Sequence, residues 1–367
     1  MKNLIQLNSK DMINAFLLFF VVHTTQVGVG IQGFQRVVYQ EAKQDAWISV
    51  LLIGLLTHII AFFMMKTLEL YDSNDLYGIH QDVYGKWIGK FVNALYVLYC
   101  SIAFFSVLRN YIECIQTWVF PDLSTWFISC TLLLIVIYTF TGGLRVIVGI
   151  SFFSFVFSIW LFPLLVYPLE FTTVQNLFPI LESNMSGILK GAMSMSFTVI
   201  GFEVLYIIYP FVKDKKNVHK HVHFGLFVTT LIYLAVMLVS LTYFSGDQLS
   251  KTIWATLSLF SIISFPFIER FEYIAICFWM LIILPNLCLY LWAAYRGTIR
   301  VVKVSPNKFV WLFSAVIFFA TLAVQTRTQI NTINDYFGMV AFYIVFIYPI
   351  FLYLVAVAKK KFISRKG

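Results

Sequence analysis

Two apolar segments of this chain carry glycines beside polar side chains. In the first, Thr25 and Gln26 precede Gly28 and Gly30, with Val29 between the glycines. Glycine lacks a Cβ atom, so the backbone can leave the helical conformation and expose N–H groups. The positive end of the half-helix that follows suits a ligand carboxylate. The alternative is that the glycines only let two helices pack closely, but the neighbouring polar atoms favour a break.

The second such segment combines Thr198 and Gly201 with Glu203. An ionised carboxylate in the middle of a membrane costs on the order of 3 kcal/mol or more. Glu203 is therefore expected to be protonated, paired or turned to a watery cavity, unless it makes a structural hydrogen bond to a neighbouring helix. A helix broken inside a bilayer needs protein, water or ligand to satisfy its backbone. Two such breaks indicate a transporter-type binding site near the membrane midplane.

Other polar residues within apolar stretches are candidates for binding or support. Pro285 removes a backbone hydrogen bond and can expose a carbonyl, and Asn286 offers an amide to a polar ligand; a simple kink is the alternative. Arg109 and Glu113 stand four residues apart on one helix face. We expect a local ion pair between them rather than direct ligand contact.

A dense charge cluster, formed by Glu269, Arg270 and Glu272, opens a later apolar segment. It could form an outer gate or a salt-bridge brace against Arg109 or Arg36, and we favour the brace.

The histidines and cysteines do not indicate catalysis. For His23 we favour a neutral, hydrogen-bonded side chain over a proton sensor. His219, His221 and His223 lie in a basic loop without a cysteine or carboxylate cluster, so we expect no metal site. The five cysteines show no disulfide or metal spacing. No nucleophile–base constellation or phosphate loop is present, so the sequence predicts neither an enzyme nor a cofactor.

Composition places these residues in a membrane protein. Sixty per cent of the 367 residues are hydrophobic and 12% are charged, against roughly 25% charged in soluble domains. The mean hydropathy is +0.84. We predict an all-α polytopic protein with ten transmembrane helices, near residues 12–35, 46–66, 90–113, 123–141, 145–169, 187–212, 222–244, 268–296, 309–325 and 336–358.

The placement of Lys and Arg predicts the orientation. Of these 26 residues, nineteen fall at the N-terminus, in even-numbered loops or in the tail. By the positive-inside rule both termini lie on the cytoplasmic side. This pattern argues against nucleic acid as the partner of the basic residues. The basic tail, residues 359–367, is expected to lie on anionic lipid head groups of the bilayer.

The ten spans form one integral membrane domain, residues 1–367. Residues 12–169 and 187–358 each contain five crossings and enter from opposite sides, which is the arithmetic of a 5+5 inverted repeat with spans 1 and 6 broken. The apolar stretch 252–265 is too short to cross and is expected to be an interfacial or re-entrant helix.

The glycine segments Gly28–Ile31 and Ile200–Glu203 resemble the signatures of the amino acid–polyamine–organocation superfamily, which implies the LeuT-type fold. More specific are Gly85–Gly89, Arg109 with Glu113, and Ile268–Glu272 after Ile253–Leu259. Together they resemble spore-germination nutrient-receptor B subunits over essentially the whole chain.

This resemblance implies a nutrient receptor in the inner membrane of a bacterial endospore, acting with A and C subunits. The ligand-binding residues it implies, together with Thr25 beside the first break, are Gly28, Val29, Gly30, Ala103, Phe104, Thr198, Ile200, Gly201 and Asn286. The leading hypothesis is a sensor whose populations shift when a small nutrient, such as an amino acid, binds. The alternatives are an amino acid transporter of the same superfamily and an ion or water conduit opened by nutrient.

Overall fold

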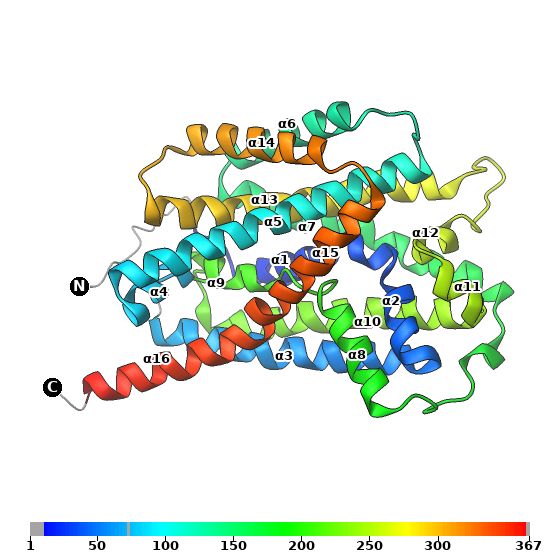
Figure 1. The fold of residues 1–367 in the computed structure, drawn as a ribbon, viewed down its shortest axis with the longest axis horizontal. Coiled ribbons are helices and arrows are strands. Elements are labelled where there is room, and N and C mark those ends of the chain that lie inside the picture. Colours follow the sequence, from blue (N-terminus) through cyan, green and yellow to red (C-terminus); the bar gives the residue numbers. More distant parts are fainter. Residues whose placement is uncertain (1–10, 72–73, 365–367) are drawn as a thin grey trace.

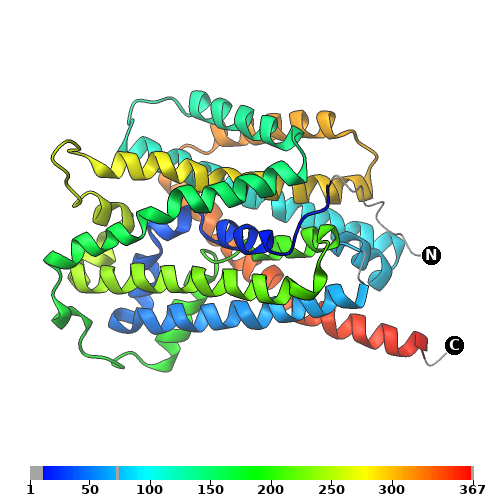
Figure 2. The same cartoon turned by 180° about the vertical axis from the view of Figure 1, so that it is seen from behind.

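Helices are the only regular elements in the part of the chain that the computed structural model describes, residues 11–71 and 74–364. They lie mostly along one direction and form a bundle, with both ends of the chain at the same end of the molecule (Figure 1, Figure 2). The Arg365 and Lys366 part of the predicted basic tail lies outside the described residues.

The membrane prediction is confirmed. Seven helical segments are long and apolar enough to cross a bilayer, and three shorter apolar helices accompany them. Each predicted span overlaps one of these ten segments, although the number of complete crossings stays a prediction. Large apolar side chains face outward, including Leu55, Phe91 and Phe319, which are 60%, 64% and 68% exposed. An apolar outer surface of this extent fits lipid rather than water.

Span 1 is broken as predicted. Its first half, α1 (Leu17–Gln26), lies at the centre of the bundle (Figure 1). A 3₁₀ turn (Val29–Gln32) and α2 (Phe34–Ala42) follow, separated from α1 by Val27 and Gly28. Span 6 is broken too. α8 (Met185–Ser196) ends before an irregular stretch, and the chain resumes as the 3₁₀ turn Phe202–Val204 and α9 (Leu205–Ile208).

Long helices surround these two broken elements. α5 (Lys86–Trp118) packs along α13 (Phe271–Val301), and α10 (Val218–Tyr243) contacts both α1 and α3 (Ala46–Tyr71). α6 (Thr125–Thr141) and α14 (Pro306–Ala323) form an outer layer beside α5 and α13 (Figure 1), while α7 (Leu144–Ser158) contacts α1 and α13.

The last span crosses the bundle obliquely. α15 (Arg327–Phe342) continues through a five-residue π-helix, Tyr343–Ile347, into α16 (Tyr348–Ser364) (Figure 1). π-helical turns are rare in proteins, and those that occur often lie near functional sites. The stretch 252–265 holds only the six-residue helix α12 (Ala255–Phe260), after α11 (Gly246–Lys251), so it does not span a membrane. A further short helix, α4 (Leu76–Tyr84), covers the bundle near the termini.

Candidate functional site

Side chains from distant helices satisfy the backbone of the first break. The Tyr233 hydroxyl donates to the Gln26 carbonyl at 3.0 Å, and the Trp279 indole N–H donates to the Gly28 carbonyl at 3.2 Å. The amide nitrogen of Asn286 donates to the Thr25 carbonyl at 2.9 Å. These three donors stabilise the open backbone inside an apolar bundle, where each unpaired carbonyl costs several kcal/mol.

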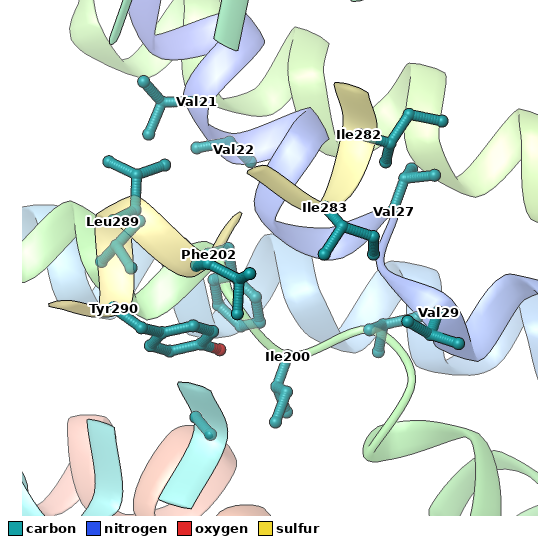
Figure 3. Packing of buried hydrophobic residues seen from close by; sticks show 14 of the residues in the cluster. Val21, Val22, Val27, Val29, Ile200, Phe202, Ile282, Ile283, Leu289 and Tyr290 are labelled. Carbon is teal, nitrogen blue, oxygen red and sulfur yellow. The ribbon is translucent and has the colours of Figure 1, made fainter. Parts of the chain in front are cut away.

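The second break lies against the first. The Gln26 amide nitrogen donates to the Val199 carbonyl at 2.9 Å. Gly201 has φ +118°, a conformation that favours glycine, and a Cβ added there would lie 2.3 Å from the Thr25 carbonyl oxygen. Figure 3 shows the apolar packing around the two breaks, with Val27 and Val29 from span 1, Ile200 and Phe202 from span 6, and Tyr290 from α13.

Glu203 closes the base of this arrangement. One carboxyl oxygen accepts hydrogen bonds from Tyr99 at 2.6 Å and Tyr290 at 3.1 Å, and the other accepts from the Gly201 N–H at 2.6 Å. The side chain therefore ties the second break to α5 and α13. Of the alternatives that the sequence left open, the structure shows the structural hydrogen bond to neighbouring helices.

A cavity of about 730 Å³ lies where the two breaks meet α5, α13 and α15. Its lining continues from the breaks to Arg36 of α2 and to Arg327 and Asp335 of α15. α2 and the start of α15 lie away from the end of the bundle that holds the termini (Figure 1). Asn110 and Asn334 form a reciprocal amide pair across its wall, with donor–acceptor distances of 3.1 and 3.0 Å. The cavity therefore has a polar outer part and a base formed by broken helices.

Eight of the ten predicted ligand-binding residues line this cavity: Thr25, Gly28, Val29, Gly30, Ala103, Thr198, Ile200 and Asn286. Phe104 does not, because successive helical residues point about 100° apart. While Ala103 lines the cavity, Phe104 packs edge-on against Phe313 of α14. Gly201 does not line it either, because the space of its missing side chain is taken by the Thr25 carbonyl.

Sequence reasoning missed much of the polar wall. Ser106 and Asn110 lie one turn apart on α5, and the Ser106 hydroxyl donates to Asn334 at 2.6 Å. Two polar residues at i and i+4 inside an apolar span were a usable signal. The cavity-lining residues Asn331, Asn334 and Asp335 of α15 were harder to find, since the predicted last span began only at residue 336.

The predicted ion pair between Arg109 and Glu113 is wrong. Arg109 donates to the carbonyls of Val324 and Gln325, at 2.7 and 2.9 Å, at the C-terminal end of α14. Glu113 instead pairs with Arg327 at 2.6 Å. Free carbonyls at a helix end attract a guanidinium, so both side chains reach across to the α14–α15 connection.

The predicted brace between the Glu269–Glu272 cluster and Arg109 or Arg36 is also wrong. Arg270 pairs with Glu272 at 2.8 Å and lies over the Tyr273 ring, while Glu269 is exposed. Glu272 lies in the first turn of α13, where the helix dipole favours an acidic residue and Arg270 is within reach.

His23 is hydrogen-bonded to Thr229 at 2.8 Å, as expected.

An ion cluster that sequence reasoning did not identify joins α4 to α13, at the end of the bundle near the termini (Figure 1). Asp75 is fully buried and caps α4 through the Gly78 N–H at 3.0 Å. It also accepts hydrogen bonds from Arg296 at 3.1 Å and Arg300 at 3.4 Å, both on α13. Arg296 lies over the ring of Phe211 at the end of span 6. We call Asp75, Arg296 and Arg300 the inner seal, after the orientation that the positive-inside rule predicts.

Known proteins of similar sequence identify the family of this chain. The sequence profile of the family described as Spore germination protein matches residues 12–330. Spore germination protein GerQB of Bacillus cereus is 36% identical, over 95% of this chain and 97% of that protein. Spore germination proteins YndE and A2 of Bacillus subtilis are 24% and 23% identical, over 93% and 96% of this chain and 95% and 98% of the relatives. On this match and coverage, the chain is a member of the Spore germination protein family.

Proposed function

We propose that this protein is the nutrient-binding subunit of a spore germination receptor. A small molecule, such as an amino acid, binds in the cavity at the two breaks, and partner A and C subunits read the resulting change. The protein then belongs in the spore inner membrane, with both termini on the core side and a LeuT-type 5+5 inverted repeat. The observation that carries this proposal is the cavity formed by two broken helices whose backbones are held open by protein side chains.

Gly30 gives the most direct test. A Cβ at Gly30 would lie 2.8 Å from the Thr198 side chain, so Gly30→Leu fills the cavity between the breaks. Gly149 on α7 has no atom within 4 Å of its added Cβ, so Gly149→Leu is the matched control. Germination of spores lacking the gene is measured with single amino acids, nucleosides and sugars.

We expect the deletion to remove the response to a nutrient, Gly149→Leu to restore it and Gly30→Leu to fail while reaching the membrane in normal amount. A Gly30→Leu strain that germinates like wild type would refute binding at this site. Gly201→Leu is unsuitable as a test, because its clash with the Thr25 carbonyl disturbs the fold itself.

A permease of the same superfamily is the second candidate, because a cavity at two helix breaks also suits alternating access. In that case the inner seal has to open so that the ligand is released. Uptake of radiolabelled nutrient by the isolated chain in proteoliposomes would support the permease. A strict need for partner subunits, without uptake, supports the receptor.

A further inference from the structure

Two buried amides in the cavity wall have a fixed orientation. Gln26 and Asn286 both line the cavity and are 2% and 1% exposed. The NH₂ group of Gln26 donates to the Val199 carbonyl, and that of Asn286 donates to the Thr25 carbonyl. A carbonyl oxygen can only accept, so each amide nitrogen must face its backbone partner. The two amide oxygens are therefore assigned without ambiguity.

Neither of these oxygens has a hydrogen-bond partner. Gln26 Oε1 and Asn286 Oδ1 are both shielded from solvent and unpaired. Three side-chain donors at the breaks are already used, because Tyr233 and Trp279 donate to backbone carbonyls and Tyr290 donates to Glu203. A buried acceptor without a partner costs about 1–3 kcal/mol. The cavity wall therefore carries two buried hydrogen-bond acceptors that lack a donor.

We infer that the ligand presents a nitrogen donor, an ammonium or an N–H group, to Gln26 Oε1 and Asn286 Oδ1. This inference rests on the proposed function and specifies which end of the nutrient reaches the breaks. It reverses the sequence-based expectation of a carboxylate there, since a carboxylate only accepts hydrogen bonds. A primary ammonium has three N–H groups and can serve both oxygens at once.

The test compares molecules that differ in this donor. The purified chain in lipid nanodiscs is titrated with amino acids and with the matching 2-oxo acids, which replace the amine by a carbonyl. Nucleosides with a ring N–H are compared with their N-methylated forms. The melting temperature and tryptophan fluorescence report binding. We expect the donor-free member of a pair to bind at least about 100-fold more weakly, because a site built for an N–H rejects its absence strongly.

Variants of Gln26 test whether its amide oxygen is the acceptor of this hydrogen bond. Gln26→Met removes the acceptor and should weaken binding of amine probes about 10-fold or more. Gln26→Glu should retain binding, because a protonated carboxyl donates its O–H to the Val199 carbonyl and keeps the other oxygen as an acceptor. Gln32→Met is the control, because Gln32 is also fully buried with an unpaired amide nitrogen but does not line the cavity. Melting without probe shows that each variant is folded.

The outcomes separate the two proposals. Binding of 2-oxo acids as tightly as amino acids, or unchanged affinity in Gln26→Met, overturns the nitrogen-donor inference. If that binding is still abolished by Gly30→Leu, the proposed binding site stands. If neither the paired amino acids and nucleosides nor a panel of sugars binds the wild-type chain, the proposed nutrient site is refuted together with the inference.

Discussion

Replacing Asp75, the acidic residue of the inner seal, should destabilise the protein by an amount that depends on the replacement. Asp75 has two separable roles, because it caps α4 and pairs with two arginines of α13. Loss of an N-cap costs about 1 kcal/mol. Loss of one partner of a fully buried ion pair costs about 3–5 kcal/mol. The side chains of Arg296 and Arg300 are 15% and 18% exposed, so water partly compensates and about 2 kcal/mol is a better figure for this share.

The expected loss for Asp75→Ala is therefore about 3 kcal/mol. Asp75→Ser keeps the cap and should lose about 2 kcal/mol, whereas Asp75→Asn keeps the cap and a neutral acceptor and should lose about 1 kcal/mol. Asp247→Ala is the control, because its ion pair with Lys251 is largely exposed and is worth less than about 0.5 kcal/mol.

Thermal unfolding of the purified protein in detergent measures this series. At about 2–4 °C per kcal/mol, Asp75→Ala should melt about 6–12 °C below wild type. The order wild type, Asn, Ser, Ala is the essential result. If all three variants melted with the Asp247→Ala control, the cluster would not stabilise the fold and the reasoning would be refuted.

Three further perturbations test other parts of the structure. Burial lowers the pKa of His80 on α4 to about 4; the unfolded chain then binds the proton first, so stability should fall by about 2 kcal/mol between pH 7.5 and pH 5, and melting of His80→Gln should lack this pH dependence. Glu203→Leu leaves three buried donors unpaired and should cost about 3 kcal/mol or more, whereas Glu203→Gln should cost less; equal melting temperatures would contradict this. Arg109→Met strips two carbonyls at the end of α14 of their donor and should lower stability by about 2 kcal/mol, a loss that chemical denaturation should detect and that Glu113→Gln should not reproduce in full.

The two helix breaks could be predicted from sequence because their cause is local. Gly28, Gly30 and Gly201 are small or tolerate unusual φ values, and polar residues stand beside them. The donors that hold the first break open could not be predicted, because Tyr233, Trp279 and Asn286 come from 207 to 261 residues further along the chain. Hydrophobic periodicity says which segments are helical and not which faces meet.

The errors have the same origin. Spacing of four residues allowed Arg109 to pair with Glu113, but it could not show that the open carbonyls of α14 and the side chain of Arg327 compete for them. Ala103 and Phe104 were both placed in the pocket, although helical geometry permits only one of two neighbours to face it squarely.

One helix joins the cavity to the inner seal. α13 supplies Asn286 and Tyr290 to the cavity wall and, about 15 Å further along its axis, Arg296 and Arg300 to the seal around Asp75. A ligand that contacts Asn286 thus acts on the same helix that carries Arg296 and Arg300 of the inner seal. Binding can shift the protein only if the ligand prefers one arrangement of α13 over another.

Under the proposed function, this connection predicts a role for the inner seal in the nutrient response. Suppose that the arrangement with the seal intact competes with the arrangement that binds nutrient. Weakening the seal then raises the fraction of protein that can bind nutrient, and the apparent dissociation constant of the nutrient falls by the same factor. Spores carrying Asp75→Asn, the mildest change, should then germinate at a lower nutrient concentration than wild type, while Gly30→Leu remains unresponsive in the same background. A higher required concentration in Asp75→Asn would mean that the seal belongs to the responsive state, and the direction of the coupling through α13 would be the opposite of the one argued.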